Sequence, residues 1–158
     1  LLHQSAHPIS ASALAERFSV TRQVIVGDIA LLRSSGADIL ATPRGYCIQG
    51  AAPGLVRRVA VRHTAHRMET ELNIMVDNGC TVVDVIVEHP LYGQLTGSLQ
   101  LSTRAEVEQF MARSLTTQPL SALTGGIHLH TIRATDEKTL ERVIQGLKDK
   151  GFLLLEDN

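Results

Sequence analysis

The stretch GGIHLHTI, residues 125–132, places two histidines in an otherwise apolar run of β-prone residues. The two glycines predict a turn, and the residues after them predict a strand. Because positions i and i+2 of a strand point to the same face, His128 and His130 are expected to stand side by side. Such a pair suits a bidentate site for a transition metal, and it equally suits a sheet face holding two hydrogen-bonded imidazoles. The spacing alone leaves both interpretations open.

The segments around this strand alternate between strand and helix patterns. Val59, Val61 and His63 share one face of a predicted strand, and a helix is expected from Ala65 to about Asp77. The segments TVVDVIVEH and GQLTGSLQL predict two antiparallel neighbours joined by a turn. Together these elements predict an α/β sandwich over residues 59–158, with one mostly antiparallel sheet and helices on one face.

Residues 1–50 show a different pattern, in which two short helices precede a β-hairpin. Ser10 and Thr21 are candidate N-caps of the two helices, and Gly36 is a candidate residue for the end of the second. Two helices joined by a turn of about three or four residues are typical of a helix-turn-helix. The segment ADILATPRGYCIQ then predicts a hairpin, or wing. We therefore expect an α+β chain, with a winged helix-turn-helix ahead of the sandwich.

The start of the second predicted helix carries side chains that suit DNA. Thr21, Arg22 and Gln23 lie there, where base contacts of a recognition helix are expected. Arginine pairs with guanine or phosphate, and glutamine pairs with adenine. Arg44, at the expected tip of the wing, is a candidate for phosphate or minor-groove contact. By periodicity alone, a winged helix that binds another protein is an equally good interpretation.

Composition and charge add a few limits. The chain of 158 residues has a net charge of −1 and a mean hydropathy of +0.07, which is typical of a soluble globular protein. Cys47 and Cys80 form no CxxC pair, and no membrane-spanning run or secretory signal is seen, so we expect a cytoplasmic protein without disulfides. The Pro/Gly segment at 51–58 predicts a linker. Residues 1–62 carry a charge of +4 and residues 63–158 carry −5, which hints at nucleic-acid contact by the first part.

Longer strings in both parts resemble known families. LAERFSVTRQVIVGDIALLRSSGADILATPRGY, residues 14–46, resembles the winged-helix DNA-binding domains of bacterial repressors. The blocks RH, ETEL and VDNG, then DVIVEHPLYG, LTGGIHLHTI and LKDKGFL, resemble the 3H domain. A winged helix followed by a 3H domain resembles the NiaR-type transcription repressors of niacin and NAD metabolism. This resemblance spans nearly the whole chain.

The resemblance implies a metal site, an effector and a partner. It implies one divalent transition metal per chain, with nickel or zinc favoured, held by His63, Glu71, His128 and His130. The mixture of imidazoles and one carboxylate also suits cobalt or Fe(II). It further implies operator DNA as target, nicotinic acid as co-repressor, and a homodimer joined through the 3H domain. Such a protein is a regulator and not an enzyme.

His89 and Tyr92 lie in the string VEHPLYG and have two interpretations. In the first, they line the effector pocket. In the second, Pro90 and Gly93 form an ordinary turn, and Tyr92 packs in the core or at a dimer interface. The residues leave both open.

Two other functions fit the same histidines. A metal-sensing regulator would use the metal itself as effector, and a metal-dependent hydrolase would use it to activate water. For the hydrolase, only Glu88 or Asp84 is a candidate general base. No Walker loop, GxGxxG or nucleophile elbow occurs, which disfavours an enzyme.

Overall fold

The strand that carries the two histidines, β6 (Ile127–Ala134), lies inside a four-stranded sheet. The computed structural model describes residues 1–50 and 54–154 of the chain. The other strands are β3 (Leu55–Arg62), β4 (Thr81–His89) and β5 (Gly93–Leu101), and the order is β3-β6-β4-β5. All three pairings are antiparallel, as the sequence predicts.

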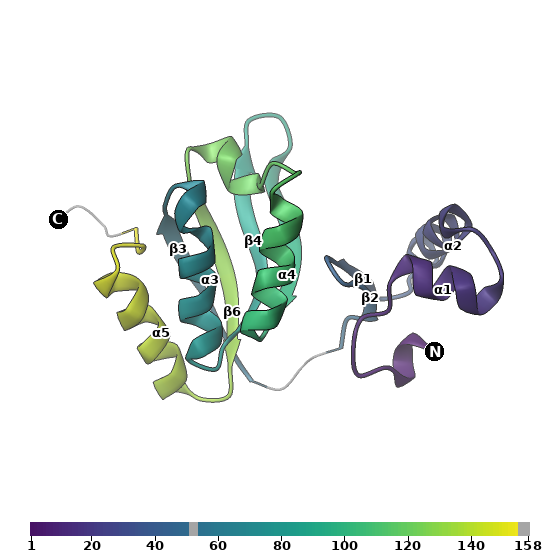
Figure 1. The fold of residues 1–158 in the computed structure, drawn as a ribbon, viewed down its shortest axis with the longest axis horizontal. Helices are drawn as coiled ribbons and strands as arrows, with labels where there is room; N and C mark the ends of the chain where they lie inside the picture. Colours follow the sequence, from purple (N-terminus) through teal and green to yellow (C-terminus); the bar gives the residue numbers. More distant parts are fainter. Residues whose placement is uncertain (51–53, 155–158) are drawn as a thin grey trace. The chain divides into compact units, whose positions relative to one another are not determined.

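Three helices cover one face of this sheet (Figure 1). They are α3 (Met68–Asp77), α4 (Arg104–Ser114) and α5 (Glu137–Asp149). Two short 3-10 helices, η2 (Ala65–Arg67) and η3 (Leu120–Thr124), lie in the connections. The apolar core between helices and sheet includes Val61, Leu72, Val82, Val107, Ile132, Leu140, Val143 and Phe152. The expected sandwich with helices on one face is confirmed. None of the helices in the described ranges is long and apolar enough to cross a membrane.

The register of β6 directs its histidines into the side of the sheet that faces the helices. His130 pairs with Val59 and His128 pairs with Val61, and both valines belong to the core under the helices. Cross-strand partners point to the same face of a sheet. The imidazoles are therefore buried at one end of an apolar core.

The N-terminal unit contains a helix-turn-helix and a wing. Its elements are η1 (Leu2–Gln4), α1 (Ala11–Phe18), α2 (Arg22–Ser34), β1 (Ile39–Thr42) and β2 (Gly45–Ile48). The predicted N-caps are confirmed, because the Ser10 hydroxyl accepts from the Ala13 N–H and the Thr21 hydroxyl from the Val24 N–H. Ser19 takes a left-handed conformation in the turn between the helices. The wing is the antiparallel β1–β2 hairpin.

The structure corrects the predicted linker, and it corrects the division of the charges at residue 62. β3 begins at Leu55, so residues 55–58 belong to a strand of the sheet; residues 51–53 of that segment lie outside the described part. Arg57, Arg58 and Arg62 are then part of the second unit, which begins at Pro53. Residues 1–52 carry four arginines against three acidic residues. The case for DNA binding therefore rests on the helix-turn-helix and not on net charge.

Candidate metal centre

Four side chains from three segments converge at one point of the second unit. His63 follows the last residue of β3, Glu71 lies in α3, and β6 supplies the other two. The Nε2 atom of His63 contacts Glu71 Oε2. Glu71 Oε1 lies 3.0 Å from Nε2 of His130 and 3.3 Å from Nε2 of His128. The structure thus brings together all four residues predicted as metal ligands.

The other nitrogen of each imidazole is held by the backbone. The Nδ1 atoms of His63, His128 and His130 lie 2.7, 2.9 and 2.7 Å from carbonyl oxygens, which belong to Thr64, Gly126 and Asp84 respectively. A carbonyl only accepts, so each Nδ1 must carry the proton and donate it. In the neutral ring, Nε2 is then a lone-pair acceptor. With all three rings neutral, three lone pairs would point toward one carboxylate, as in metal sites whose histidines are oriented by backbone carbonyls.

The cluster is closed to solvent, and one oxygen of its carboxylate is unsatisfied. The side chains are 1% (His63), 0% (Glu71), 2% (His128) and 3% (His130) exposed. Within residues 1–50 and 54–154, Glu71 Oε1 has no hydrogen-bond partner, despite the two nearby nitrogens. A buried carboxylate without a partner is costly. A cation between the nitrogens and the carboxylate removes that cost, so the residues fit a metal ion.

The pKa values in the metal-free protein show how protons take the place of a cation. Burial alone lowers the pKa of His63, but the hydrogen bond and charge of Glu71 outweigh it and raise that pKa above the usual 6.5. His130 is raised for the same reasons. Burial alone raises the pKa of Glu71, but the charge of His130 and the contacts with the His128, His130 and His63 rings hold that pKa well below 4.5. A metal must displace these protons in order to bind.

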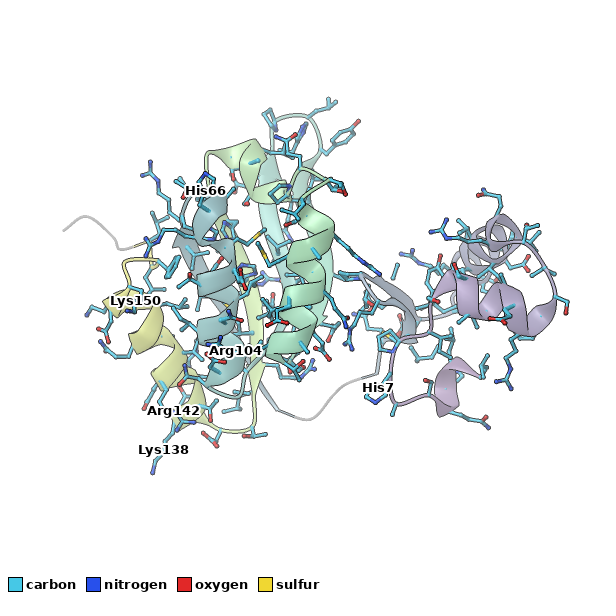
Figure 2. All side chains as sticks on the ribbon, viewed as in Figure 1. His7, His66, Arg104, Lys138, Arg142 and Lys150 are labelled. Carbon is cyan, nitrogen blue, oxygen red and sulfur yellow. The ribbon has the colours of Figure 1, made fainter. Side chains whose placement is uncertain are left out.

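The donor set narrows the class of metal. Three residues each offer one donor atom, and these atoms lie within 4.8 Å of one another: His63, Glu71 and His128. The Nε2 atom of His130 contacts Glu71 Oε1 and so belongs to the same cluster. Imidazole nitrogen with a single carboxylate is the ligand set of zinc, nickel, cobalt and iron, and not of magnesium or calcium. The remaining histidine near the cluster, His66, is exposed and lies in η2 (Figure 2).

Gly126 positions two of the ligands, a role that the sequence interpretation missed. Its carbonyl accepts from the His63 N–H at 3.3 Å and from the His128 ring at 2.9 Å. A Cβ at this position would fall closer than 3.0 Å to the His63 carbonyl oxygen, and φ is +91°. Only glycine allows this approach. The Gly-Gly pair before His-x-His was the available signal.

Asp84 positions the third imidazole through a break in the sheet. The register between β4 and β6 shifts between Val82 and Asp84, which marks a β-bulge. The Asp84 carboxylate accepts from the Thr131 N–H at 2.9 Å, and the Asp84 carbonyl accepts from His130. Asp84 therefore has a structural task, which disfavours it as a general base, while Glu88 is exposed. An aspartate inside an apolar strand was the signal in the sequence.

His89 and Tyr92 lie outside this cluster, at the β4–β5 hairpin. The His89 Nδ1 atom accepts from the N–H groups of Leu91 and Tyr92, and the two rings lie 5.1 Å apart. Tyr92 is 70% exposed and Leu91 is 75% exposed. Within one chain the hairpin is thus an exposed turn. The exposure of Tyr92 contradicts the interpretation in which it packs in the core, whereas a role of His89 and Tyr92 in an effector pocket or at a dimer interface stays a prediction.

The predicted DNA-contact residues lie at the start of α2 and in the turn of the wing. Arg22 and Gln23 open α2 and are exposed, and Thr21 is its exposed N-cap. The Thr21 hydroxyl is engaged in that cap at 3.3 Å from the Val24 nitrogen. Arg44 lies in the two-residue turn of the wing and is half-buried. Within the N-terminal unit, the side chains of Arg22 and Gln23 are therefore exposed at the first turn of α2.

The chain is similar to known proteins along almost its whole length. The 3H domain family matches residues 56–156, and an HTH domain family matches residues 1–47. The chain is 50% identical over 158 residues to the probable transcription repressor NiaR of Thermotoga maritima, which covers 99% of this chain and 90% of that protein. It is 42% identical over 159 residues to the transcription repressor NadR of Bacillus subtilis, which covers 97% of this chain and 88% of that protein.

Proposed function

Because the chain belongs to the family of transcription repressors that join a helix-turn-helix domain to a 3H domain, we propose that it represses genes of niacin and NAD metabolism. Nicotinic acid acts as co-repressor, and the protein binds operator DNA as a cytoplasmic homodimer without catalytic activity of its own. The observation that carries the proposal is the full-length likeness to two repressors. The buried three-histidine, one-glutamate cluster supports a resident metal in the effector domain.

The DNA-binding part of the proposal rests on α2. Its exposed first turn presents Arg22 and Gln23 for base edges, and Arg44 in the wing is placed for the backbone or minor groove. One recognition helix reads only a short half-site, so a dimer is needed for specific binding. The homodimer contacts are assigned to the 3H domain.

The metal-binding part rests on the electrostatics of the cluster. One divalent ion, with nickel or zinc favoured, would be held by His63, Glu71, His128 and His130. Its positive charge would neutralise the buried carboxylate of Glu71. The chain's own contribution is orientation, because three backbone carbonyls fix the direction of the three rings. The full burial of these side chains favours a resident metal over one that exchanges as a signal.

Operator binding measured by fluorescence anisotropy tests the proposal. A DNA duplex selected in vitro for binding is titrated with metal-loaded protein, with and without nicotinic acid. We expect tighter operator binding with the ligand, because a co-repressor must bind the DNA-competent state better. Unchanged operator affinity at saturating nicotinic acid contradicts the co-repressor. Operator binding that instead follows added metal identifies a metal sensor.

A matched pair of variants tests the DNA surface. Arg22→Ala removes a cation at the first turn of α2, whereas Arg33→Ala removes an exposed cation at the last turn of the same helix. We expect Arg22→Ala to cost about 1–3 kcal/mol of operator binding and Arg33→Ala to cost less. Equal losses would contradict the assignment of the first turn as the base-reading end.

A further inference from the structure

A cavity of about 530 Å³ adjoins the backbone of His63 at the end of the sheet. One wall is the segment 62–67, which connects β3 to α3. The other wall is the segment 119–126, which contains η3 and the turn before β6. This volume falls within the usual range of small-molecule sites, about 300–1,000 Å³. The described wall residues include no aspartate or glutamate, whereas Arg62 and Arg67 both line the cavity. Its charge therefore suits an anion.

The polar groups of the cavity are available to a ligand. Ser121 is 8% exposed, and its hydroxyl makes no hydrogen bond within residues 1–50 and 54–154. The hydroxyl oxygen is not sealed from solvent, so it is accessible to a ligand in the cavity. Arg62 is exposed, and its side chain forms no ion pair with the described residues. Arg67 donates one N–H to the Lys150 carbonyl at 2.6 Å, and a guanidinium has further N–H donors to offer.

Of the four predicted metal ligands, only His63 is among the residues that line this cavity. The His63 ring is 1% exposed, and its two nitrogens are directed at the Thr64 carbonyl and at Glu71. The other three ligands are at most 3% exposed, and none of them lines the cavity. A ligand in the cavity therefore meets guanidinium groups and not the metal.

We propose that this cavity is the effector site, and that Arg62 and Arg67 bind the carboxylate of a small planar aromatic acid, with the Ser121 hydroxyl as a further donor. The inference rests on the proposed function, which supplies nicotinic acid as the effector. In this arrangement the metal fixes the position of His63 at the wall of the cavity and does not bind the carboxylate of the ligand. Arginine pairs with a carboxylate through parallel N–H bonds, which gives directional recognition.

Packing connects the cavity to the metal ligands. The Arg67 guanidinium lies 4.2 Å above the ring of Phe152, which is fully buried. The Phe152 ring in turn packs edge-on against His63, with centroids 5.5 Å apart. An occupant that repositions Arg67 therefore acts on a contact next to a metal ligand. By linkage, effector and metal then alter each other's affinity by the same factor.

Calorimetric titration of metal-loaded protein with nicotinic acid tests the site. Arg62→Met removes the cation without breaking a described contact, and Arg58→Met removes an exposed cation four residues earlier on β3, outside the cavity. We expect Arg62→Met to weaken binding at least tenfold and Arg58→Met to leave it unchanged. Ser121→Ala should weaken it less. Nicotinamide, which lacks the carboxylate charge, should not bind, and benzoate should compete.

The outcomes separate this inference from the proposed function. If the wild-type protein binds nicotinic acid and Arg62→Met binds it equally well, the cavity is not the effector site, while the co-repressor stands. If benzoate binds in a way that depends on Arg62 but nicotinic acid does not bind, the cavity stands and the co-repressor is wrong. If neither acid binds, both are overturned. Measurements of metal content and thermal unfolding for each variant show whether a loss of acid binding occurs without a loss of metal or of folded protein.

Discussion

Alanine substitutions at the two neighbouring glycines before β6 should differ in their effects on stability and on metal binding. Gly125 has φ +63° and Gly126 has φ +91°, so an alanine at either position takes a backbone conformation that L-residues disfavour. A Cβ on Gly125 would meet nothing within 4 Å, whereas one on Gly126 would fall closer than 3.0 Å to the His63 carbonyl oxygen. The two substitutions are chemically identical and differ only in that collision.

The magnitudes follow from this difference. Gly125→Ala should cost about 1–2 kcal/mol of unfolding free energy, the usual strain of a left-handed alanine. Gly126→Ala carries that strain and must also move the turn away from His63, which breaks two hydrogen bonds at the Gly126 carbonyl. At about 1 kcal/mol for each bond, the total is about 3–4 kcal/mol. Metal affinity should fall about 10–100-fold, as for lost supporting contacts elsewhere.

Urea unfolding of the chelated protein measures the first effect, and competition with a chromophoric chelator measures the second. The Gly125→Ala variant should hold metal as tightly as the wild type. If the two variants lose the same stability and bind metal equally, the Gly126 carbonyl does not position His63 and His128, and the argument for a pre-oriented cluster is refuted.

Three further predictions concern other parts of the chain. Asp84→Ala removes the acceptor that holds the bulge beside His130, so metal affinity should fall about 10–100-fold in the same competition assay, while Asp84→Asn should retain most of it. Glu71 raises the pKa of His130 above the usual 6.5, so the metal-free protein should lose stability as pH rises through the raised value. Metal affinity should increase over the same pH window, because fewer protons compete with the metal. Urea unfolding with and without a chelator, at about pH 6 and about pH 8, measures the stability of the metal-free protein and the stabilisation by metal. Gly27→Ala, at an exposed position in α2 with nothing within 4 Å of a Cβ, should stabilise the N-terminal unit by about 1 kcal/mol in thermal unfolding followed by circular dichroism.

Each of these expectations has an outcome that contradicts it. Full metal affinity in Asp84→Ala would mean that the bulge does not orient His130. A metal-free protein that gains stability on going from about pH 6 to about pH 8 would reverse the sign expected from the raised histidine pKa. Destabilisation by Gly27→Ala would reveal a contact of α2 that the described residues do not contain.

Local patterns account for what could be predicted. The N-caps Ser10 and Thr21 act within three residues of themselves, and the shared face of His128 and His130 follows from the period of a strand. The wing was predicted from a short run of turn and β-prone residues. Each of these features depends on contacts close in sequence, which the sequence displays directly.

Features that depend on distant contacts were missed or misplaced. The charge pattern groups the arginines of β3 with the N-terminal part, because nothing in the local sequence shows that residues 55–62 pair with β6. The string VEHPLYG also allows Tyr92 to pack in the core, whereas the β4–β5 hairpin leaves Tyr92 exposed. The cavity beside His63 joins segments more than 50 residues apart, and no periodicity indicates it.

Sequence patterns indicate a winged helix-turn-helix and an antiparallel sheet with helices on one face, and the resemblance to a family indicates four candidate metal ligands. Only the tertiary structure decided that those four side chains meet, that three backbone carbonyls orient the imidazoles toward Glu71, and that the arginine-lined cavity lies behind His63. The physical reason is the sequence separation between the residues in contact. Helix caps and strand alternation are set by neighbours in the chain, whereas the orientation of a ligand ring is set by whichever backbone group the fold brings beside it.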